Sequence, residues 1–232
     1  MADMTMTLTG ISSMATRQVL DDLAAAFEAK SGQRVAIESV GGVAAAKRIE
    51  AGEAFDIVVL ASDAVERLAA SGRIDATSRV RIARSGIAVA VASGAPHPSI
   101  GDETAVRDAV LAARSIGYST GPSGVYLTHL FERWGIAERI ASRIVQAQPG
   151  VAVGTLIARG ELELGFQQMS EMTGVAGIDV LGMLPPEIQT LTVFEGAVCA
   201  NANAPQLARA FLAFLASRDA ESTKVQHGME PC

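Results

Sequence analysis

The sequence predicts an α/β protein of two lobes, in which each lobe is a mostly parallel sheet flanked by helices and two hinge strands join the lobes. Its 232 residues are 49% hydrophobic but only 4% aromatic, a composition typical of helices packed closely on sheets. Strand-like and helix-like runs alternate along the chain, which favours parallel strands with crossover helices. The alternation stops near residue 84 and then starts again, which indicates a second lobe.

The first lobe is expected to open with three strand–helix units. Apolar residues recur at helical spacing over 14–27, and Gly32 ends that pattern. The continuous apolar run 55–60 is typical of a strand buried on both faces. A helix should follow it, with Ser62 or Asp63 as its N-cap. The expected strands are 6–11, 35–40 and 55–60, and the expected helices are 14–30, 43–50 and 62–70.

The pattern changes after residue 80. A strand over 87–92 has no helix directly after it, and a loop with Gly94, Pro96 and Pro98 leads into a second series. That series predicts strands at 115–118, 144–148, 162–167, 178–181 and 191–200, and helices at 103–113, 122–135 and 151–158. A helix over 205–216 and another from Asp219 close the chain.

The two lobes are interleaved in sequence. We expect residues 1–83 with 197–232 to form lobe I and residues 84–196 to form lobe II. The segments around Arg84 and Thr192 would then cross between the lobes. A protein of this kind is expected to bind its ligand in the cleft between the lobes, where strand C-termini and helix N-termini converge.

The charge pattern argues against several functions. The net charge is -6, and no basic run is interleaved with aromatic residues, so we expect no nucleic-acid partner. His97, His129 and His227 lack metal-ligand spacing, so we expect no metal and no cofactor. Cys199 and Cys232 are expected to be free thiols. A small anionic ligand stays compatible with an acidic chain, because backbone dipoles act locally.

The expected location depends on processing. No apolar run is long enough to span a membrane, and the first ten residues lack a basic segment followed by a long apolar one. We expect a periplasmic protein if a signal peptide has been removed, and a cytoplasmic one otherwise. We also expect a monomer.

The leading candidate for ligand binding is the stretch I-G-Y-S-T-G-P-S-G-V-Y at 116–126. A short strand ends there and a helix begins at Pro122, a residue that fits the first helical position. The first N–H groups of a helix have no internal partner and favour negative charge. The hydroxyls of Ser119, Thr120 and Ser123 can also donate. The stretch predicts a cradle for an oxyanion or carboxylate, and an ordinary N-cap is the alternative.

Three further turns should face the same cleft. They lie at Ser12-Ser13, at Gly41-Gly42-Val43, and at Gln167-Gln168 with Ser170 and Glu171. Each alone is compatible with an ordinary cap or tight turn, but their recurrence at one topological place in both lobes favours a binding role. Because side chains alternate along a strand, we expect only one of the two glutamines to face the cleft.

Few charged residues are expected near the cleft. Arg84 could form a bidentate pair with a carboxylate, or it could be a solvated surface arginine. Asp56 fits a capping or turn role better than a ligand contact. Glu171 is the one carboxylate that the spacing places near the cleft. The sequence contains no nucleophile elbow, phosphate loop or nucleophile–base pair.

Four segments carry a family resemblance. They are the opening strand ending in Ser12-Ser13, R-I-E-A-G-E-A-F-D-I-V-V-L at 48–60, T-G-P-S-G-V-Y at 120–126, and A-R-G-E-L-E-L-G-F-Q-Q-M-S-E at 158–171. Over nearly its whole length the chain resembles the type II periplasmic-binding-protein fold, and most closely the molybdate-binding-protein-like group of ABC-transporter solute-binding proteins. The resemblance implies a protein that closes on a small oxyanion or carboxylate, with an ABC-transporter permease as partner.

Molybdate binders of this family hold the anion with a serine in the first turn, a serine in the second, backbone N–H groups and a tyrosine hydroxyl. Here Ser12 or Ser13 matches the first serine. Gly41-Gly42 stand where the second serine is expected, and Gln168 stands at the tyrosine position. A carboxylate ligand would tolerate the glutamine and could recruit Arg84.

The resemblance also leaves an enzyme open as the alternative. A branch of the same group is aconitate isomerase, which interconverts trans- and cis-aconitate. That chemistry is proton removal next to a carboxylate, with the negative charge held by helix N-termini. Glu171 would be the base in that case.

Overall fold

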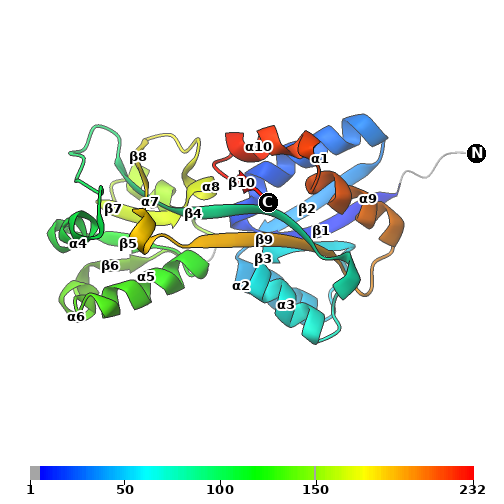
Figure 1. Ribbon diagram of the computed structural model, residues 1–232, viewed down its shortest axis with the longest axis horizontal. Coiled ribbons are helices and arrows are strands. Elements are labelled where there is room, and N and C mark those ends of the chain that lie inside the picture. The colour runs from blue at the N-terminus through cyan, green and yellow to red at the C-terminus, as the bar shows by residue number, and fades with distance from the viewer. Residues whose placement is uncertain (1–5, 149) are drawn as a thin grey trace, which may run out of the picture. The chain divides into compact units, whose positions relative to one another are not determined.

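The computed structural model describes residues 6–148 and 150–232, which form two compact units (Figure 1). The first unit comprises the described chain up to Arg84 together with Val193–Cys232, and the second comprises Ser85–Thr192. The chain passes from one unit to the other twice, within strands β4 (Val80–Ala92) and β9 (Leu191–Val198).

The first unit is built on a central strand, β1 (Thr7–Ser13). Strands β2 (Arg34–Val40) and β3 (Ile57–Ala61) pair with it in parallel, and β9 pairs antiparallel with β3. The parallel pairs confirm the expectation from the three strand–helix units. The helices of this unit are α1 (Arg17–Ser31), α2 (Gly42–Glu50), α3 (Ser62–Ala70), α9 (Pro205–Leu215) and α10 (Glu221–Gln226).

Two hydrophobic cores lie on opposite faces of this sheet. Ile57 and Val59 of β3 pack into one core with α1 and α9, whereas Val58 and Leu60 pack into the other with α2 and α3. All four side chains are almost fully buried, because consecutive residues of a strand point to opposite faces. The expectation of a strand buried on both faces is confirmed.

The second unit is built on β7 (Leu164–Gln168). Its parallel neighbour is β5 (Ile116–Tyr118), which in turn pairs in parallel with β6 (Ile144–Gln146). On the other side β7 pairs antiparallel with β4, and β8 (Ile178–Met183) also pairs antiparallel with β4. The helices are α4 (Glu103–Ala112), α5 (Pro122–Arg133), α6 (Ala137–Ile140), α7 (Val153–Ala158) and α8 (Met169–Met172).

Several local predictions were wrong. The strand expected over 87–92 begins at Val80. Gln167 and Gln168 lie in β7 and not in a turn, because they pair with Ala88 and Ile87 of β4. Neither short helix α6 or α8 was expected, nor was β10 (Glu230–Pro231), which pairs with β4.

The predicted cap of α3 was also wrong. The N-cap position is Ala61, which has no side chain that could cap, and Ser62 and Asp63 already belong to the helix. The Asp63 carboxylate instead accepts a hydrogen bond from Arg67 one turn later, at 3.0 Å. An i, i+4 pair of this kind stabilises an exposed helix only slightly.

Asp56 joins three segments of the first unit. Its Oδ2 accepts hydrogen bonds from the backbone N–H and the hydroxyl of Thr9 at 2.8 and 2.9 Å. Its Oδ1 accepts from the N–H groups of Asn203 and Ala204, at 2.7 and 2.9 Å, where α9 begins. Burial acts to raise the pKa of Asp56, but these hydrogen bonds outweigh it and hold the pKa below its usual range. Of the predicted capping or turn roles, Asp56 has the turn role, because it holds the residues just before α9 and that helix has no side-chain cap.

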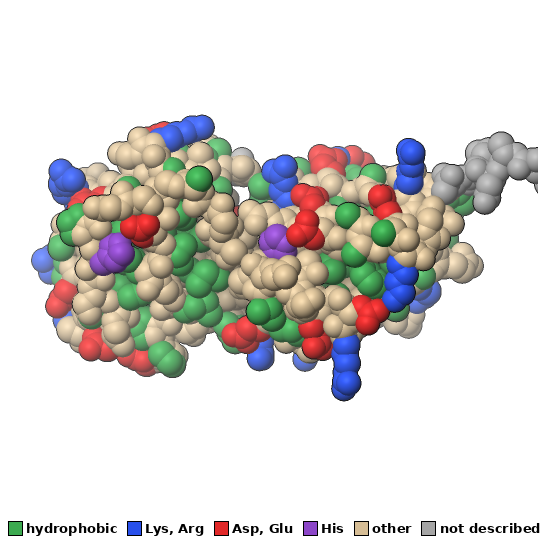
Figure 2. Space-filling view, turned by 90° about the horizontal axis from the view of Figure 1, so that it is seen from above, with side chains coloured by type: hydrophobic (Ala, Val, Ile, Leu, Met, Phe, Trp, Pro, Cys, Tyr) green, Lys and Arg blue, Asp and Glu red, His purple; other side chains and the backbone are tan. Residues whose placement is uncertain are grey.

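The surface carries mixed charge. On the face shown in Figure 2, acidic and basic side chains are interspersed and form no large patch of one sign. Within residues 6–148 and 150–232, no helix is long and apolar enough to cross a bilayer. Cys199 is buried, Cys232 is exposed and both are free thiols, as predicted. Burial, together with the nearby Asp56 charge, raises the pKa of the Cys199 thiol to about 12, so this thiol is unreactive.

Candidate ligand site

In the first unit, polar groups gather where β1 and β2 end. Ser12 lies opposite Ser39 in the parallel register, and their hydroxyl oxygens are 2.8 Å apart. Ser13 follows at the end of β1, and Gly41 and Gly42 follow β2. We call Ser12, Ser13, Ser39, Gly41, Gly42 and Val43 the first-unit turn cluster. Ser39 of β2 supplies a serine hydroxyl beside Ser12, two residues before Gly41, which stands where the second serine of the resemblance was expected.

One hydroxyl of this cluster has no hydrogen-bond partner. The Ser13 side chain is 8% exposed, and its Oγ contacts no donor or acceptor in the described part of the chain. Its backbone oxygen, in contrast, accepts from the hydroxyl of Thr16 at 3.0 Å. A buried hydroxyl without a partner costs free energy, so it calls for a functional reason.

The start of α2 completes the first-unit turn cluster. Gly41 is its N-cap and provides no side-chain cap, so the N–H groups of the first turn keep their capacity to donate. Val43, in that turn, is 61% exposed. This arrangement suits an anion that approaches the backbone closely.

In the second unit, polar groups gather where β5 ends and α5 begins. Gly121 is the N-cap of α5, and the helix begins at Pro122 as predicted. The N–H of Gly121 donates to Ser119 Oγ at 3.3 Å, and the hydroxyl oxygens of Ser119 and Ser123 are 3.4 Å apart. Gly124 is required here, because a Cβ at this position would lie 1.7 Å from the Ser119 carbonyl oxygen.

The sheet register brings the end of β7 to the same edge. Tyr118 of β5 lies opposite Phe166 of β7, and the two strands are parallel, so the residues after both strands emerge side by side. We call the polar residues of this edge the second-unit turn cluster. Its members are Ser85, Ser119, Thr120, Ser123, Gln167, Gln168, Ser170, Glu171 and Thr192.

Two more buried polar atoms without partners lie in this cluster. Gln168 donates from Nε2 to the hydroxyl of Thr192 at 2.8 Å, but its Oε1 has no partner. The Ser170 hydroxyl also has none, although the Ser170 N–H donates to Ser85 Oγ at 3.4 Å. Both side chains are at most 3% exposed. Together with Ser13 Oγ, they are the only buried side-chain polar atoms without partners among the described residues.

Gln167 has its amide fully occupied within the protein. Its Oε1 accepts from the N–H of Val153 at 2.8 Å, and its Nε2 donates to Oε1 of Glu171 at 2.7 Å. Gln167 and Gln168 point to opposite faces of β7, and of the two only Gln168 keeps an amide oxygen without a partner. This agrees with the expectation that alternation separates the two glutamines.

Glu171 is the one carboxylic acid of this cluster. Burial raises the pKa of its carboxyl to about 7, and the hydrogen bond from Gln167 opposes that rise. None of the residues of β7, of α7 or of the rest of α8 is ionisable. The carboxyl therefore changes its charge near neutral pH without a charged neighbour on these elements.

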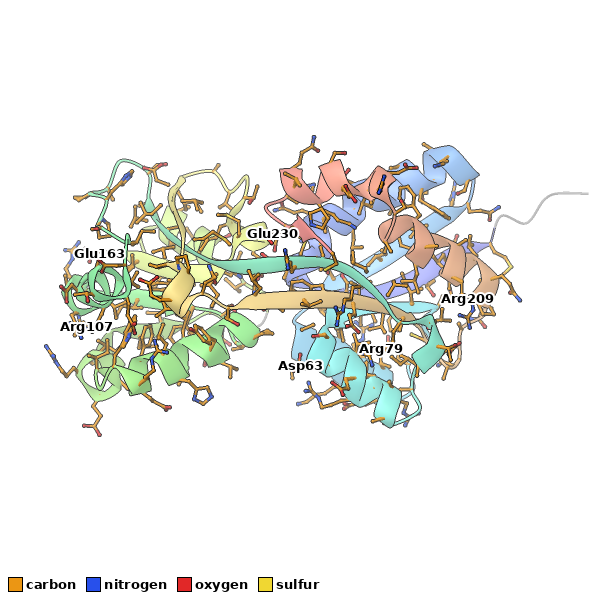
Figure 3. All side chains as sticks on the ribbon, viewed as in Figure 1. Asp63, Arg79, Arg107, Glu163, Arg209 and Glu230 are labelled. Atoms are coloured by element: carbon orange, nitrogen blue, oxygen red, sulfur yellow. The ribbon has the colours of Figure 1, made fainter. Side chains whose placement is uncertain are left out.

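Arg84 is held by an acid of its own unit. Its Nε donates to Oε2 of Glu230 at 2.7 Å, and both side chains are about half exposed (Figure 3 labels Glu230). Arg79, also labelled in Figure 3, pairs in the same way with the buried Glu195 at 2.7 Å. Arg84 could bind a ligand with its other nitrogen atoms, but the ligand would then share the guanidinium with the carboxylate of Glu230.

Sequence reasoning did not name Ser39, Ser85 or Thr192 as ligand-binding residues. Ser39 and Ser85 lie inside long strands, and Thr192 near the start of one, where a hydroxyl carries no sequence signal. Their positions follow from strand register. The residues that were named at strand ends could be found because Gly, Pro and Ser mark turns.

Comparison with known proteins identifies the family. Residues 8–230 match the family model described as "Bacterial extracellular solute-binding protein". The chain belongs to this family. The resemblance to solute-binding proteins inferred from sequence is therefore confirmed, and the family description is that of an extracellular protein.

One relative of this solute-binding protein has a named activity. An aconitate isomerase from Pseudomonas sp is 37% identical over 233 residues, which cover 97% of this chain and 88% of the relative.

Solved structures confirm the type II periplasmic-binding-protein fold. The periplasmic molybdate-binding protein of Azotobacter vinelandii is 20% identical, with a TM-score of 0.82 over 96% of this chain and 98% of its own. PEB3, a Campylobacter jejuni protein solved with L-phospholactate bound, is 14% identical, with a TM-score of 0.76 over 97% of this chain and 100% of its own. At these identities the likeness concerns the fold alone.

Proposed function

We propose that this protein binds a small dicarboxylate or tricarboxylate, with aconitate as the first candidate, through the first-unit and second-unit turn clusters. The observation that carries the proposal is the set of unpartnered buried atoms, namely Ser13 Oγ, Gln168 Oε1 and Ser170 Oγ. All three belong to these clusters. Ser13 Oγ and Ser170 Oγ are hydroxyls that can donate to a carboxylate, whereas Gln168 would donate only with its amide turned so that the NH2 group faces the ligand and the oxygen accepts from the Thr192 hydroxyl. The name of the relative suggests which carboxylate to try first.

The donors in this proposal are mostly neutral. Ser12, Ser13, Ser119, Thr120 and Ser123 would donate from hydroxyls, and the first turns of α2 and α5 would donate from backbone N–H groups. Helix N-termini stabilise a carboxylate without a full positive charge. Gly41, Gly42 and Val43 would act through their backbone, and Gln168 through its amide at the end of β7. Gln167 would act through its hydrogen bond to Glu171 and not by direct contact with the ligand. Arg84 would add a counter-charge shared with Glu230.

The test is a thermal-shift and calorimetry panel. Trans-aconitate, cis-aconitate, citrate, molybdate, tungstate, sulfate and phosphate are compared at equal ionic strength. A ligand present at 100 times its Kd stabilises the folded state by about 2.7 kcal/mol, which corresponds to roughly 5–10 °C for a chain of this size. A carboxylate should give this shift. A shift with molybdate or tungstate alone would overturn the carboxylate proposal.

A second candidate function is isomerisation of the bound aconitate, and the acidity of Glu171 favours it. A carboxyl with a pKa of about 7 is poised to accept and return a proton at neutral pH. As a carboxylate, Glu171 would take a proton from the CH2 carbon beside the double bond. The electron pair of that C–H bond would form a new double bond, and the proton would return to the far carbon of the old one. No redox partner is needed.

Turnover separates the two candidates. Incubation of trans-aconitate with the protein, followed by proton NMR, would show cis-aconitate and exchange of the CH2 hydrogen with solvent deuterium. Binding without either change would indicate a binding protein that does not isomerise aconitate. In that case we propose an ABC-transporter permease as its partner. Loss of both changes in Glu171→Gln, with binding retained, would assign the proton transfer to Glu171.

A further inference from the structure

A chain of two hydrogen bonds leads from α7 to the Glu171 carboxyl. The N–H of Val153, the first residue of α7, donates to Oε1 of Gln167 at 2.8 Å. Since a backbone N–H can only donate, this contact fixes the orientation of the Gln167 amide. The NH2 group of the amide must then face Glu171, and it donates to Oε1 of that carboxyl at 2.7 Å.

Both anchors of this chain are rigid parts of the second unit. Val153 is fully buried and packs in a core with Ala88, Ala90 and Ile157. Gln167 is 1% exposed and lies opposite Ala88 in the pairing of β7 with β4. The Gln167 amide therefore has little freedom to turn away from Glu171.

We propose that Gln167 is the positioning residue for Glu171, holding one carboxyl oxygen so that the other is left to exchange a proton with the bound carboxylate. This inference rests on the proposed function and deepens it. Glu171 lies on α8, a helix of four residues that alone cannot fix a side chain. The Gln167 amide supplies a contact that it receives from a strand.

The same contact sets the charge state of Glu171. A hydrogen bond donated to a carboxylate favours the ionised form. Gln167 therefore lowers the pKa of Glu171, against the rise that burial causes. No charged group faces the Glu171 carboxyl from α7 or β7. On β4, beside Ser85, the nearest charge in sequence is Arg84, which pairs with Glu230.

The experiment compares Gln167→Leu with a matched control, Gln189→Leu. Gln189 is a glutamine of the same unit whose amide also bonds backbone groups, accepting from the N–H of Ile87 at 2.9 Å and donating to its oxygen at 3.0 Å. The protein is labelled with 13C at glutamate carboxyls, and the Glu171 resonance is assigned by its absence in Glu171→Gln. Each variant is then titrated by NMR.

We expect Gln167→Leu to raise the titration midpoint of Glu171 by roughly one pH unit and Gln189→Leu to leave it unchanged. If the isomerase candidate holds, the pH profile of turnover should shift upward with the midpoint, and kcat should fall more than KM changes. An unchanged midpoint in Gln167→Leu would overturn the inference.

A second variant covers the case in which Gln167→Leu does not fold. Gln167→Glu keeps an oxygen for the Val153 N–H and replaces the donor to Glu171 by a second carboxyl. Two carboxyls in contact share one proton, so the pair should titrate in two separated steps. A single wild-type-like step would again contradict the proposal. These titrations need no ligand. Absence of aconitate binding would therefore contradict the proposed function without contradicting the role of Gln167.

Discussion

Gln167 Nε2 donates a hydrogen bond to Glu171 Oε1 across 2.7 Å, and this is the only side-chain partner found for that carboxyl among the described residues. The neighbouring residue Gln168 has an amide oxygen with no partner. One glutamine thus supports the ionisable group, and the next is left for a ligand.

Glu171→Gln should stabilise the protein at alkaline pH. The pKa of Glu171 is raised from 4.5 to about 7 in the folded state, so the folded protein binds more protons than the unfolded chain between these values. Stability is therefore lost as pH rises from 4.5 through 7. We expect the variant to gain up to about 3 kcal/mol at pH 8 and little at pH 4. Urea unfolding at both pH values measures the difference, and an equal effect at both would contradict the assignment.

Ser13→Ala should weaken carboxylate binding without loss of stability, and Gln168→Ala should weaken binding at a cost in stability. The Ser13 hydroxyl has no partner in the protein, so its removal breaks no hydrogen bond, whereas Gln168→Ala also removes the Nε2 donor to Thr192 and leaves a cavity. A lost bond to a charged ligand corresponds to about 1.5–3 kcal/mol, or a roughly 10–150-fold higher Kd. Calorimetry with the ligand identified by the panel measures the change.

The matched control for these variants is Ser217→Ala. The Ser217 hydroxyl donates to the Phe214 oxygen at 2.7 Å, at the end of α9 and apart from both turn clusters. Its Kd should equal that of the parent. If Ser13→Ala and Gln168→Ala bind like this control, the proposed site is wrong.

Gly124→Ala should destabilise the second unit and impair binding. The added methyl group would lie 1.7 Å from the Ser119 carbonyl oxygen, which is backbone and cannot rotate away. The first turn of α5 would have to move from the end of β5, at a cost of about 1–3 kcal/mol or more. Gly101→Ala is the control, since a Cβ there meets no atom within 4 Å. Thermal unfolding of both variants provides the comparison, and equal melting temperatures would show that the turn adapts.

Asp56→Asn should destabilise the first unit although the two side chains have the same shape. Both carboxylate oxygens of Asp56 accept from backbone N–H groups, so either orientation of the asparagine amide sets its NH2 against a donor. We expect a loss of about 1–3 kcal/mol at pH 7. Asp63→Asn, at an exposed site, should change stability by less than about 0.5 kcal/mol.

The Asp56 contribution should also depend on pH. Hydrogen bonds hold the pKa of Asp56 below its ordinary 3.8, so its stabilisation is present above that value and is lost as pH falls through the folded-state pKa. The difference between the parent and Asp56→Asn should therefore shrink in acid. Urea unfolding from pH 7 down to pH 3 follows it, and a constant difference would assign the effect to packing.

The sequence by itself determined the fold class, most elements and the family. The apolar run over β3, the helical spacing of α1, and Pro122 after a hydroxylated loop are local patterns with local physical causes, so they can be recognised without tertiary contacts. The four family segments led to the same fold. The chain order of strands and helices also predicted crossings near Arg84 and Thr192.

Tertiary structure alone decided which polar groups are free. The sequence presents Gln167 and Gln168 as equivalent, but the Val153 N–H and Glu171 occupy one amide, while the oxygen of the other is left unpaired. The sequence likewise cannot show that Ser39 lies beside Ser12, since that depends on the register of β1 with β2. Hydrogen-bond satisfaction and burial are properties of segments brought together by folding, and so the acidity of Glu171 could be read only from the folded chain.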